Sequence, residues 1–307
     1  MTEVVAALDC GSNSTRLLIQ NDAGEAQRRE MRITRLGQGV DKAGQLVADA
    51  MARSFEVLSQ YRTYMDEANV SRGLLVATSA VRDAKNGEDF LHAAHEITGI
   101  ACQVLTGQQE ATYSYEGATT GLEHDERVTV ILDIGGGSTE LAMMRGGVLH
   151  SFSMQLGCVR VTERSLGSDV VTPERAAATR AMIEDELQRA FGAEPSFDVV
   201  AGNVRLVGLA GTVATLAQLD AGLTTYDRDA VHHRLLSRST VRYWRDLLAD
   251  ETPAERLAHP GMVVGREDVL VAGLYVLDAV MDRLKVDELL TSENDILDGI
   301  VESLLRS

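Results

Sequence analysis

The sequence predicts an α/β protein in which two duplicated domains face one another across a cleft. Runs of apolar residues typical of buried strands alternate with helix-like segments, and their order repeats in the two halves of the chain. The length of 307 residues favours two domains, since a domain has about 150 residues. A strand–turn–strand motif occurs twice, and Asp9 of the first copy corresponds to Asp133 of the second, 124 positions later. Repetition of so long a motif indicates duplication.

The composition excludes several classes of protein. With 29 basic and 46 acidic residues the chain has a net charge of −17, which speaks against nucleic-acid binding because that needs a basic surface. No apolar run is long enough to span a membrane, and the first residues lack the features of a signal peptide. The three cysteines lack the spacing of a zinc site or a disulfide framework. We therefore expect a cytoplasmic protein that binds neither nucleic acid nor a membrane.

In the first half, three strands precede a long helix, and strands and helices then alternate. Asn86 is placed to cap a helix that Gly99 ends, and Thr106 and Gln109 have the spacing of a capping box at the start of the next helix. The strands are expected at residues 4–8, 15–19, 26–33, 74–77 and 102–105. The helices are expected at residues 43–67, 86–98 and 106–119.

The second half repeats this order. Thr172, followed by proline, favours a helix start, and Gly192 lies just beyond the end of that helix. The strands are expected at residues 128–132, 139–144, 148–154, 206–208 and 288–291. The helices are expected at residues 172–191, 211–219, 239–249, 267–284 and 295–305. The polar stretch 121–126 predicts domains over 1–120 and 121–307, each with one copy of the motif, and the last helix is a candidate to pack back on the first domain.

Each copy of the repeated motif predicts a β-hairpin whose tip carries little side chain. Glycine lets the backbone approach a ligand closely, and consecutive N–H groups and hydroxyls in such a turn can bind an anion such as phosphate. The alternative is a pair of ordinary hairpin turns whose polar side chains bond their own backbone. The predicted phosphate-binding residues are Gly11, Ser12, Asn13, Ser14 and Arg16 in the first copy and Gly135, Gly136, Gly137 and Ser138 in the second.

Three carboxylates of the motif are candidate metal ligands. Asp9 and Asp133 end the first strand of each copy, and Glu140 follows in the second strand of the second copy. Carboxylates of this kind suit one Mg²⁺ that stays mostly hydrated and is bridged to substrate oxygens. For Glu140, which lies just inside a strand, a solvated strand face is the alternative.

Asp9–Arg16 and Asp133–Glu140 resemble the two phosphate motifs of the acetate and sugar kinase, Hsp70 and actin superfamily. Further stretches make the chain similar, more narrowly, to the short two-domain form of the exopolyphosphatase/guanosine pentaphosphate phosphohydrolase family. These stretches are residues 35–39, 77–86, 106–111, 156–160 and 208–212. The resemblance implies two actin-like, ribonuclease H-like domains. It also implies an enzyme that uses Mg²⁺, or alternatively Mn²⁺, to remove the terminal phosphate from inorganic polyphosphate.

Alternative functions stay open at this point. The resemblance is compatible with hydrolysis of guanosine pentaphosphate, and the superfamily also contains kinases that phosphorylate small molecules. A nucleotide-dependent switch is a third alternative, ranked last because the chain is short for an added client-binding domain. A homodimer is compatible with polyphosphate hydrolysis because it would lengthen a binding channel.

Arg82 and Glu110 are the remaining catalytic candidates. Arg82 follows a predicted strand at the carboxyl edge of the sheet, where a guanidinium can bind phosphate through two hydrogen bonds. A surface arginine paired with Asp83 or Glu88 is the alternative. Glu110 lies in the first turn of a helix. Either its carboxylate is only stabilised there by the helix N-terminus, or it acts as a general base that deprotonates water. The resemblance implies that Arg82 contacts the terminal phosphate and that Glu110 is the general base. The preceding residue, Gln109, stands where the family often has an acid.

Gly211 and Thr212 belong to a glycine-rich turn that joins a predicted strand to a helix. Amide groups at a helix N-terminus can bind an anion, which makes both residues candidates for phosphate binding. Close packing of the strand on the helix explains such a turn equally well. Leu209 stands where the family often has a hydroxyl residue, so fewer donors are expected here.

Overall fold

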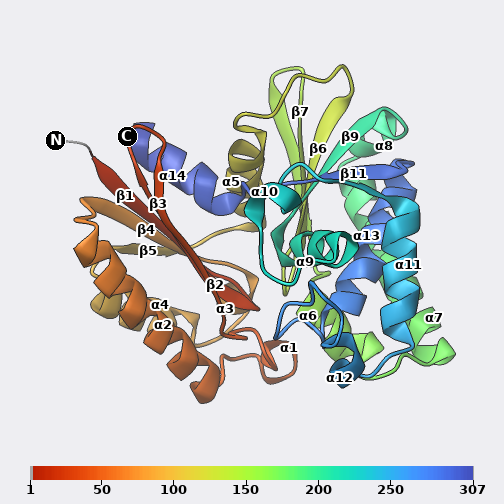
Figure 1. Cartoon of the computed structure of the whole chain (residues 1–307), viewed down its shortest axis with the longest axis horizontal. Coiled ribbons are helices and arrows are strands. Elements are labelled where there is room, and N and C mark those ends of the chain that lie inside the picture. Colours follow the sequence, from red (N-terminus) through yellow and green to blue (C-terminus); the bar gives the residue numbers. More distant parts are fainter. Residues whose placement is uncertain (1–2, 307) are drawn as a thin grey trace. The chain divides into compact units, whose positions relative to one another are not determined.

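Two β-sheets organise the chain, which a computed structural model describes for residues 3–306 (Figure 1). The described residues form two units. The first contains the residues up to Gly117 and those from Asp295 onward, and the second is Ala118–Asn294. The chain therefore enters the second unit once and returns to the first for its last helix. No described helix is both long and apolar enough to cross a membrane.

The sheet of the first unit has the strand order β3-β2-β1-β4-β5. Alternate residues of β1 point to opposite faces. Leu8 belongs to a core with Tyr61 and Phe90, whereas Val5 packs with Ile300. The strands are β1 Val4–Cys10, β2 Ser14–Asn21, β3 Ala26–Ile33, β4 Arg72–Ala77 and β5 Ala101–Val104. The helices are α1 Val40–Ala43, α2 Ala48–Glu67, α3 Ser79–Arg82, α4 Gly87–Thr98, α5 Gly107–Thr119 and α14 Ile296–Arg306.

The sheet of the second unit has the order β10-β11-β9-β6-β7-β8. Its core is centred on α13, a helix that is buried along most of its length. The strands are β6 Val128–Ile134, β7 Thr139–Arg145, β8 Val148–Met154, β9 Val204–Leu209, β10 Leu235–Ser237 and β11 Glu288–Thr291. The helices are α6 Cys158–Val161, the π-helix Thr162–Leu166, α7 Pro173–Ala193, α8 Ser196–Val200, α9 Ala210–Ala221, α10 Arg228–Val231, α11 Arg238–Ala249, α12 Pro253–Arg256 and α13 Leu270–Leu284.

The two sheets share one topology. The second sheet contains the order β8-β7-β6-β9-β11, which corresponds to the order β3-β2-β1-β4-β5 of the first sheet. Strand β10 is an added edge strand. In both sheets an antiparallel hairpin is joined to parallel strands. The predicted fold class, two duplicated actin-like α/β domains, is confirmed.

The long helix expected over residues 43–67 begins later, at Ala48, and a separate short helix, α1, ends at Ala43. Gly44 takes the left-handed conformation, with a φ angle of 65°, and ends α1 before α2 begins at Ala48. The Asn86 side chain holds the intervening loop, because it accepts a hydrogen bond from the Leu46 amide (2.8 Å) and donates one to the Leu46 carbonyl (3.0 Å). The expected side-chain cap of Asn86 on α4 is therefore wrong.

Other helix starts were predicted well. Thr172 accepts a hydrogen bond from the Arg175 amide at 3.3 Å and caps α7, as expected. Strand β11 has the expected bounds. Strand β10 and the short helices α8, α10 and α12 were not expected, because segments this short show no hydrophobic period.

Asp278 of α13 stabilises the packing of α11 on α13 through Arg238 and Arg242 of α11. Burial raises its pKa, but hydrogen bonds from Arg238 and Arg242, with the charges of Arg238 and Arg245, lower it below the usual range overall. A carboxylate whose pKa falls on folding stabilises the native state above its unfolded pKa, and this contribution is lost as pH falls through the folded value.

Asp278→Asn is accordingly expected to lower the free energy of unfolding by about 2 kcal/mol at pH 7, the cost of losing charge-assisted hydrogen bonds. Urea unfolding of both proteins between pH 7 and pH 3 measures this. The difference should be constant at neutral pH and should shrink as pH falls below about 4, the ordinary pKa of an aspartate. A difference that grows in acid would contradict the assignment.

Candidate active site

The two copies of the motif form hairpins with the same register. Asp9 lies opposite Arg16 in the first hairpin, and Asp133 lies opposite Glu140 in the second. Each turn is closed in the same way. The amide of Gly11 donates to the Ser14 carbonyl at 3.0 Å, and the amide of Gly135 donates to the Ser138 carbonyl at 3.0 Å. The duplication inferred from sequence therefore extends to individual hydrogen bonds.

The carbonyl groups of the first turn are fixed by the segment that follows β3. The Ser12 carbonyl accepts from the Gly37 amide at 2.8 Å, and the Asn13 carbonyl accepts from the amides of Thr34 (3.1 Å) and Arg35 (2.9 Å). The amides of Ser12 and Asn13 donate to no atom of the described residues. This turn therefore presents N–H groups to an anion while its carbonyls are held by the protein.

The second turn is supported from the segment after β8. The Gly135 carbonyl accepts from the Cys158 amide at 2.9 Å, and the Gly136 carbonyl accepts from the amides of Val159 (2.9 Å) and Arg160 (3.0 Å). Within residues 3–306 the amides of Gly136 and Gly137 have no acceptor. Two of the sequence stretches outside the hairpins, 35–39 and 156–160, thus contribute by holding the turns in shape.

Gly157 approaches the second turn more closely than any other residue type can. A Cβ atom at this position would lie 2.2 Å from the carbonyl carbon of Gly136 and 2.3 Å from the nitrogen of Gly137. Gly37 has the equivalent place beside the first turn, where a Cβ atom would lie 2.7 Å from the Ser12 Cβ. Both contacts require glycine, because backbone atoms cannot move away as a flexible side chain can.

Asn13 carries a polar side chain that the protein does not satisfy. It is 4% exposed, and neither its carbonyl oxygen nor its amide nitrogen has a hydrogen-bond partner among the described residues. Ser12, by contrast, shares a hydrogen bond of 3.0 Å with the Ser79 hydroxyl at the start of α3. Because a buried unsatisfied amide is costly, Asn13 is suited to a ligand held in the turn.

Arg82 and Glu110 are brought together at the carboxyl edge of the first sheet. Strands β1, β4 and β5 are parallel neighbours that end side by side. An Arg82 Nη donates to the Leu105 carbonyl at 2.8 Å and to the Glu110 carboxylate at 3.3 Å. The alternative of a surface pair with Asp83 or Glu88 is wrong. The side chain of Glu110 is only 9% exposed, so the arginine compensates a largely buried charge.

The predicted capping box is confirmed and explains Gln109. Its side-chain oxygen accepts from the Thr106 amide (2.9 Å) and hydroxyl (3.0 Å), and its own amide donates to the Thr106 hydroxyl at 3.2 Å. The neutral glutamine therefore fixes the first turn of α5, from which Glu110 projects. It adds no second negative charge beside Glu110.

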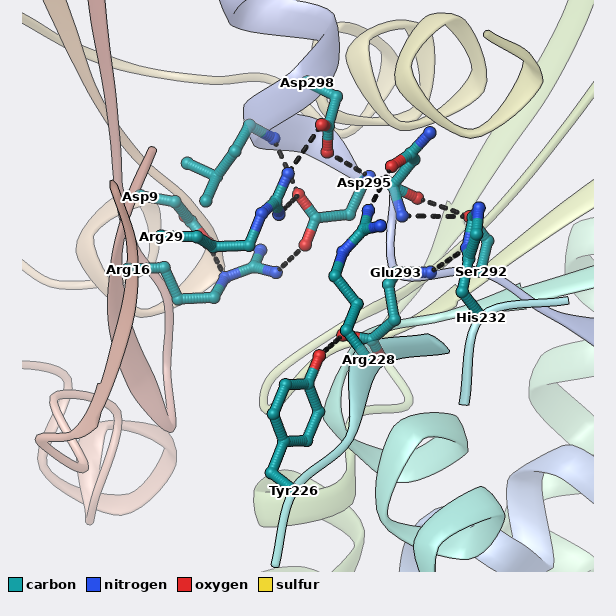
Figure 2. Close-up of polar contacts among 12 residues, drawn as sticks. Asp9, Arg16, Arg29, Tyr226, Arg228, His232, Ser292, Glu293, Asp295 and Asp298 are labelled. Atoms are coloured by element: carbon teal, nitrogen blue, oxygen red, sulfur yellow. Dashed lines mark hydrogen bonds and ion pairs between the residues drawn. The ribbon is translucent and has the colours of Figure 1, made fainter. Parts of the chain in front are cut away.

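An ion-pair network connects the first hairpin and β3 with the start of α14 (Figure 2). Arg16 donates to Asp9 at 2.6 Å and also pairs with Asp295, which follows the return of the chain to the first unit. Arg29 pairs with Asp298 at 2.5 Å and lies 3.7 Å from Asp295. Burial raises the pKa of Asp9, and Arg16 partly offsets this. Sequence analysis missed Asp295, Arg29 and Asp298, because no local pattern connects the strands with the last helix.

Asp133 and Glu140 form the corresponding pair in the second unit, but both are acids. They are 6% and 2% exposed, so the alternative of a solvated strand face for Glu140 is wrong. The Ser153 hydroxyl donates to Glu140. Like charges directly opposite on neighbouring strands are destabilising, and a divalent cation would relieve them. Residues 3–306 contain no cluster of three potential ligands. The pair nevertheless fits Mg²⁺, which needs one or two carboxylates with water and substrate oxygens.

The glycine-rich turn at 208–212 is packed and strained. Ala210 has a φ angle of 64°, a conformation rare outside glycine. A Cβ atom on Gly211 would lie 1.8 Å from the guanidinium carbon of Arg266. The Thr212 hydroxyl lies against α13, where a Cβ on Gly273 would come within 2.5 Å of it. The structure thus places the Thr212 side chain in helix packing and brings in Arg266, a buried cation that sequence analysis did not identify.

Duplicated α/β units, each with a turn whose amides have no acceptor among the described residues and with an acidic side chain beside it, are compatible with binding of phosphoryl groups. The chain belongs to the Ppx/GppA phosphatase family, whose model matches residues 20–307. It is 37% identical, over an alignment of 316 residues, to exopolyphosphatase 2 of Mycobacterium tuberculosis, with 98% of both chains covered. The family resemblance stated from sequence is confirmed.

Solved structures agree with this assignment. The crystal structure of an exopolyphosphatase-like protein superposes with a TM-score of 0.92 and 32% identity, covering 99% of both chains. The Ppx/GppA family member of Aquifex aeolicus superposes with a TM-score of 0.80 and 29% identity, covering 100% of this chain and 98% of that one. The chain is therefore an enzyme, a phosphoanhydride hydrolase, with the fold of these relatives.

Proposed function

We propose that this protein is an exopolyphosphatase, a metal-dependent phosphoanhydride hydrolase that removes terminal orthophosphate from inorganic polyphosphate. The observation that carries the proposal is the pair of equivalent turns, each with two amides that have no acceptor among the described residues. The identity of 37% with exopolyphosphatase 2 supports the choice of substrate. Hydrolysis of guanosine pentaphosphate is the second candidate, because the sequence resembles the exopolyphosphatase/guanosine pentaphosphate phosphohydrolase family.

The turns at Gly11–Ser14 and Gly135–Ser138 each bind phosphate groups through backbone amides in this proposal. Arg82 contacts the terminal phosphoryl group and neutralises charge that develops on its oxygens. Because Arg82 also donates to Glu110 at 3.3 Å, it connects the phosphate to the proposed base. Gly211 and Thr212 are proposed as further phosphate-binding residues, and the Thr212 hydroxyl is buried without a hydrogen-bond partner among the described residues.

Glu110 orients the attacking water and accepts its proton. The water oxygen forms a bond to the terminal phosphorus, and the anhydride bond breaks with its electron pair moving to the shortened polyphosphate. Phosphoryl transfer needs mainly positioning and charge stabilisation, so no covalent nucleophile is required. The two hydrogen bonds that fix Arg82, together with the capping box, keep the carboxylate in place.

Asp133 and Glu140 would hold Mg²⁺, or alternatively Mn²⁺, in the second unit. Asp9 stays a candidate metal ligand of the first unit, through its second oxygen. That oxygen is buried without a hydrogen bond among the described residues, since Arg16 contacts the other one. When bound, the ion would neutralise charge on the phosphate oxygens. The chain's own contribution is to orient Glu140 through the hydrogen bond from Ser153.

Glu140→Gln is expected to raise the Mg²⁺ concentration for half-maximal phosphate release about tenfold or more, since losing even a hydrogen-bond partner of a metal ligand costs about tenfold in metal affinity. A titration of Mg²⁺ into chelator-treated enzyme measures the effect, and binding of Mn²⁺ followed by its paramagnetic signal gives a readout independent of turnover. Glu126→Gln, at an exposed position of the same unit, is the control. An unchanged metal requirement would remove Glu140 from the metal site.

The substrate is tested by measuring orthophosphate release, with Mg²⁺, from long polyphosphate, tripolyphosphate, guanosine pentaphosphate and ATP in parallel. Release from polyphosphate is the expected result. Release from the guanosine nucleotide alone would keep the mechanism and change the substrate. Phosphorylation of an added acceptor with ATP would favour the small-molecule kinase instead. A cytoplasmic location and a homodimer are proposed as well, and light scattering tests the latter.

A further inference from the structure

A cavity of about 540 Å³ in the second unit concentrates positive charge. Most of its lining residues belong to the helices α7, α11 and α13, and α7 and α11 both contact α13 (Figure 1). Six of its lining residues are basic and three are acidic, in a chain whose net charge is −17. We call it the arginine cavity, and its basic residues are Arg180, Arg238, Arg242, Arg245, Arg283 and Lys285.

Asp278 fixes three of these arginines in place. Its carboxylate accepts from Arg238 at 2.7 Å and from Arg242 at 2.9 Å, and it also pairs with Arg245. The Asp278 side chain is 13% exposed, so one largely buried carboxylate serves three guanidinium groups. Each guanidinium has five N–H donors, and a single carboxylate cannot accept most of them. Asp282 also pairs with Arg238, and Asp246 with Arg245, yet most N–H donors of the three guanidinium groups lie outside these contacts.

Arg180 adds a cation that no carboxylate of the described chain neutralises. Its guanidinium carbon lies 5.2 Å from the centre of the Tyr275 ring, and that of Arg245 lies 5.3 Å from the same ring. Glu184 is one helical turn further along α7 and lines the same cavity, yet it makes no ion pair with Arg180. Lys285, which takes a left-handed conformation after α13, also has no carboxylate partner within residues 3–306. Unpaired cations gathered around a cavity repel one another, and a bound anion would remove this cost.

We propose that the arginine cavity binds a compact polyanion that carries several phosphate groups, as a site separate from the two turns. Arginine recognises phosphate oxygens through paired hydrogen bonds, which matches the donors that Asp278 arranges. Tyr275 is 5% exposed and has guanidinium groups near its ring, so a nucleobase has no free aromatic surface to stack on. The ligand is therefore recognised by its phosphates alone, as in a short condensed phosphate. This binding does not depend on the proposed hydrolysis.

The test is a titration of tripolyphosphate, without divalent metal, into the full-length protein. Binding is followed by isothermal titration calorimetry, which needs no reporter group in the cavity. The expected result is a saturable change that Arg180→Gln weakens about fivefold and Arg180→Gln/Arg242→Gln weakens tenfold or more, since each lost charge-assisted contact costs about 1 kcal/mol or more. Arg189→Gln is the control, because Arg189 lies on α7 with its side chain 74% exposed.

Four results would overturn the proposal: no saturable change, equal affinity in wild type and double variant, loss of affinity in Arg189→Gln as well, or an equal response to sulfate at matched ionic strength. GTP and orthophosphate are titrated in the same way, and a condensed phosphate should bind more tightly than either. Arg180 makes no hydrogen bond or ion pair with described residues, so Arg180→Gln should keep the wild-type melting temperature. For this single variant a fold defect cannot be mistaken for loss of the site.

Discussion

Glu110→Gln is expected to reduce phosphate release from polyphosphate by about 10²–10⁴-fold, the usual contribution of a general base. The amide keeps the size of the carboxylate and can still accept the hydrogen bond from Arg82, so the geometry of the site is preserved. What is lost is the capacity to take a proton from water. The turnover number should fall while the KM for polyphosphate changes little, since the proposed phosphate contacts lie elsewhere.

Steady-state kinetics at saturating polyphosphate and Mg²⁺ measure this effect. Glu96→Gln removes an exposed carboxylate from α4 in the same unit and should leave the rate unchanged. The loss in Glu110→Gln should persist at every Mg²⁺ concentration, which separates the base from a metal ligand. A variant as active as the wild type would show that another group deprotonates the water.

Gly157→Ala is the second change with a large expected effect. The added Cβ would lie 2.2 Å from backbone atoms of Gly136, so the second turn must move. Overpacking of this kind costs about 1–3 kcal/mol. A displacement of about 1 Å at the turn can lower kcat/KM about 100-fold, because phosphate binding depends on the direction of the amides. Thermal unfolding and kinetics on the same preparation separate the two effects.

Gly192→Ala is the matched control for that experiment. No atom lies within 4 Å of a Cβ at position 192, and Gly192 does not need a positive φ angle. This variant should be as active as the wild type and at least as stable, because alanine favours helix over glycine. If Gly157→Ala were equally active, the contact between Gly157 and the second turn would not matter for phosphate binding.

The hairpins could be predicted from sequence because everything that defines them is local. The apolar strand, the aspartate at its end and the small turn residues stand next to one another, and the second copy repeats them in register. The capping box before Glu110 is equally local, and its hydrogen bonds are as expected. Such features depend on neighbours in the chain, which a sequence pattern contains.

The residues that sequence analysis missed depend on distant partners. Arg16 pairs with Asp295, 279 positions away, and Arg29 pairs with Asp298, 269 positions away. Arg266 lies beside Gly211 only because the second unit is folded, since the two residues are far apart in the sequence. Asn86 has the position of a helix cap, but its side chain satisfies both polar groups of Leu46 instead. These choices are decided by tertiary contacts that override local preference.

The central claim, that the enzyme removes phosphate from the ends of polyphosphate, is tested most directly by following chain length during hydrolysis. Long polyphosphate is incubated with enzyme and Mg²⁺, and ³¹P NMR resolves orthophosphate, end groups and internal groups over time. We expect orthophosphate to be the first product and internal phosphate groups to decline without a rise in end groups. Early accumulation of end groups would show internal cleavage, and absence of orthophosphate would show that polyphosphate is not the substrate; either result would contradict the account.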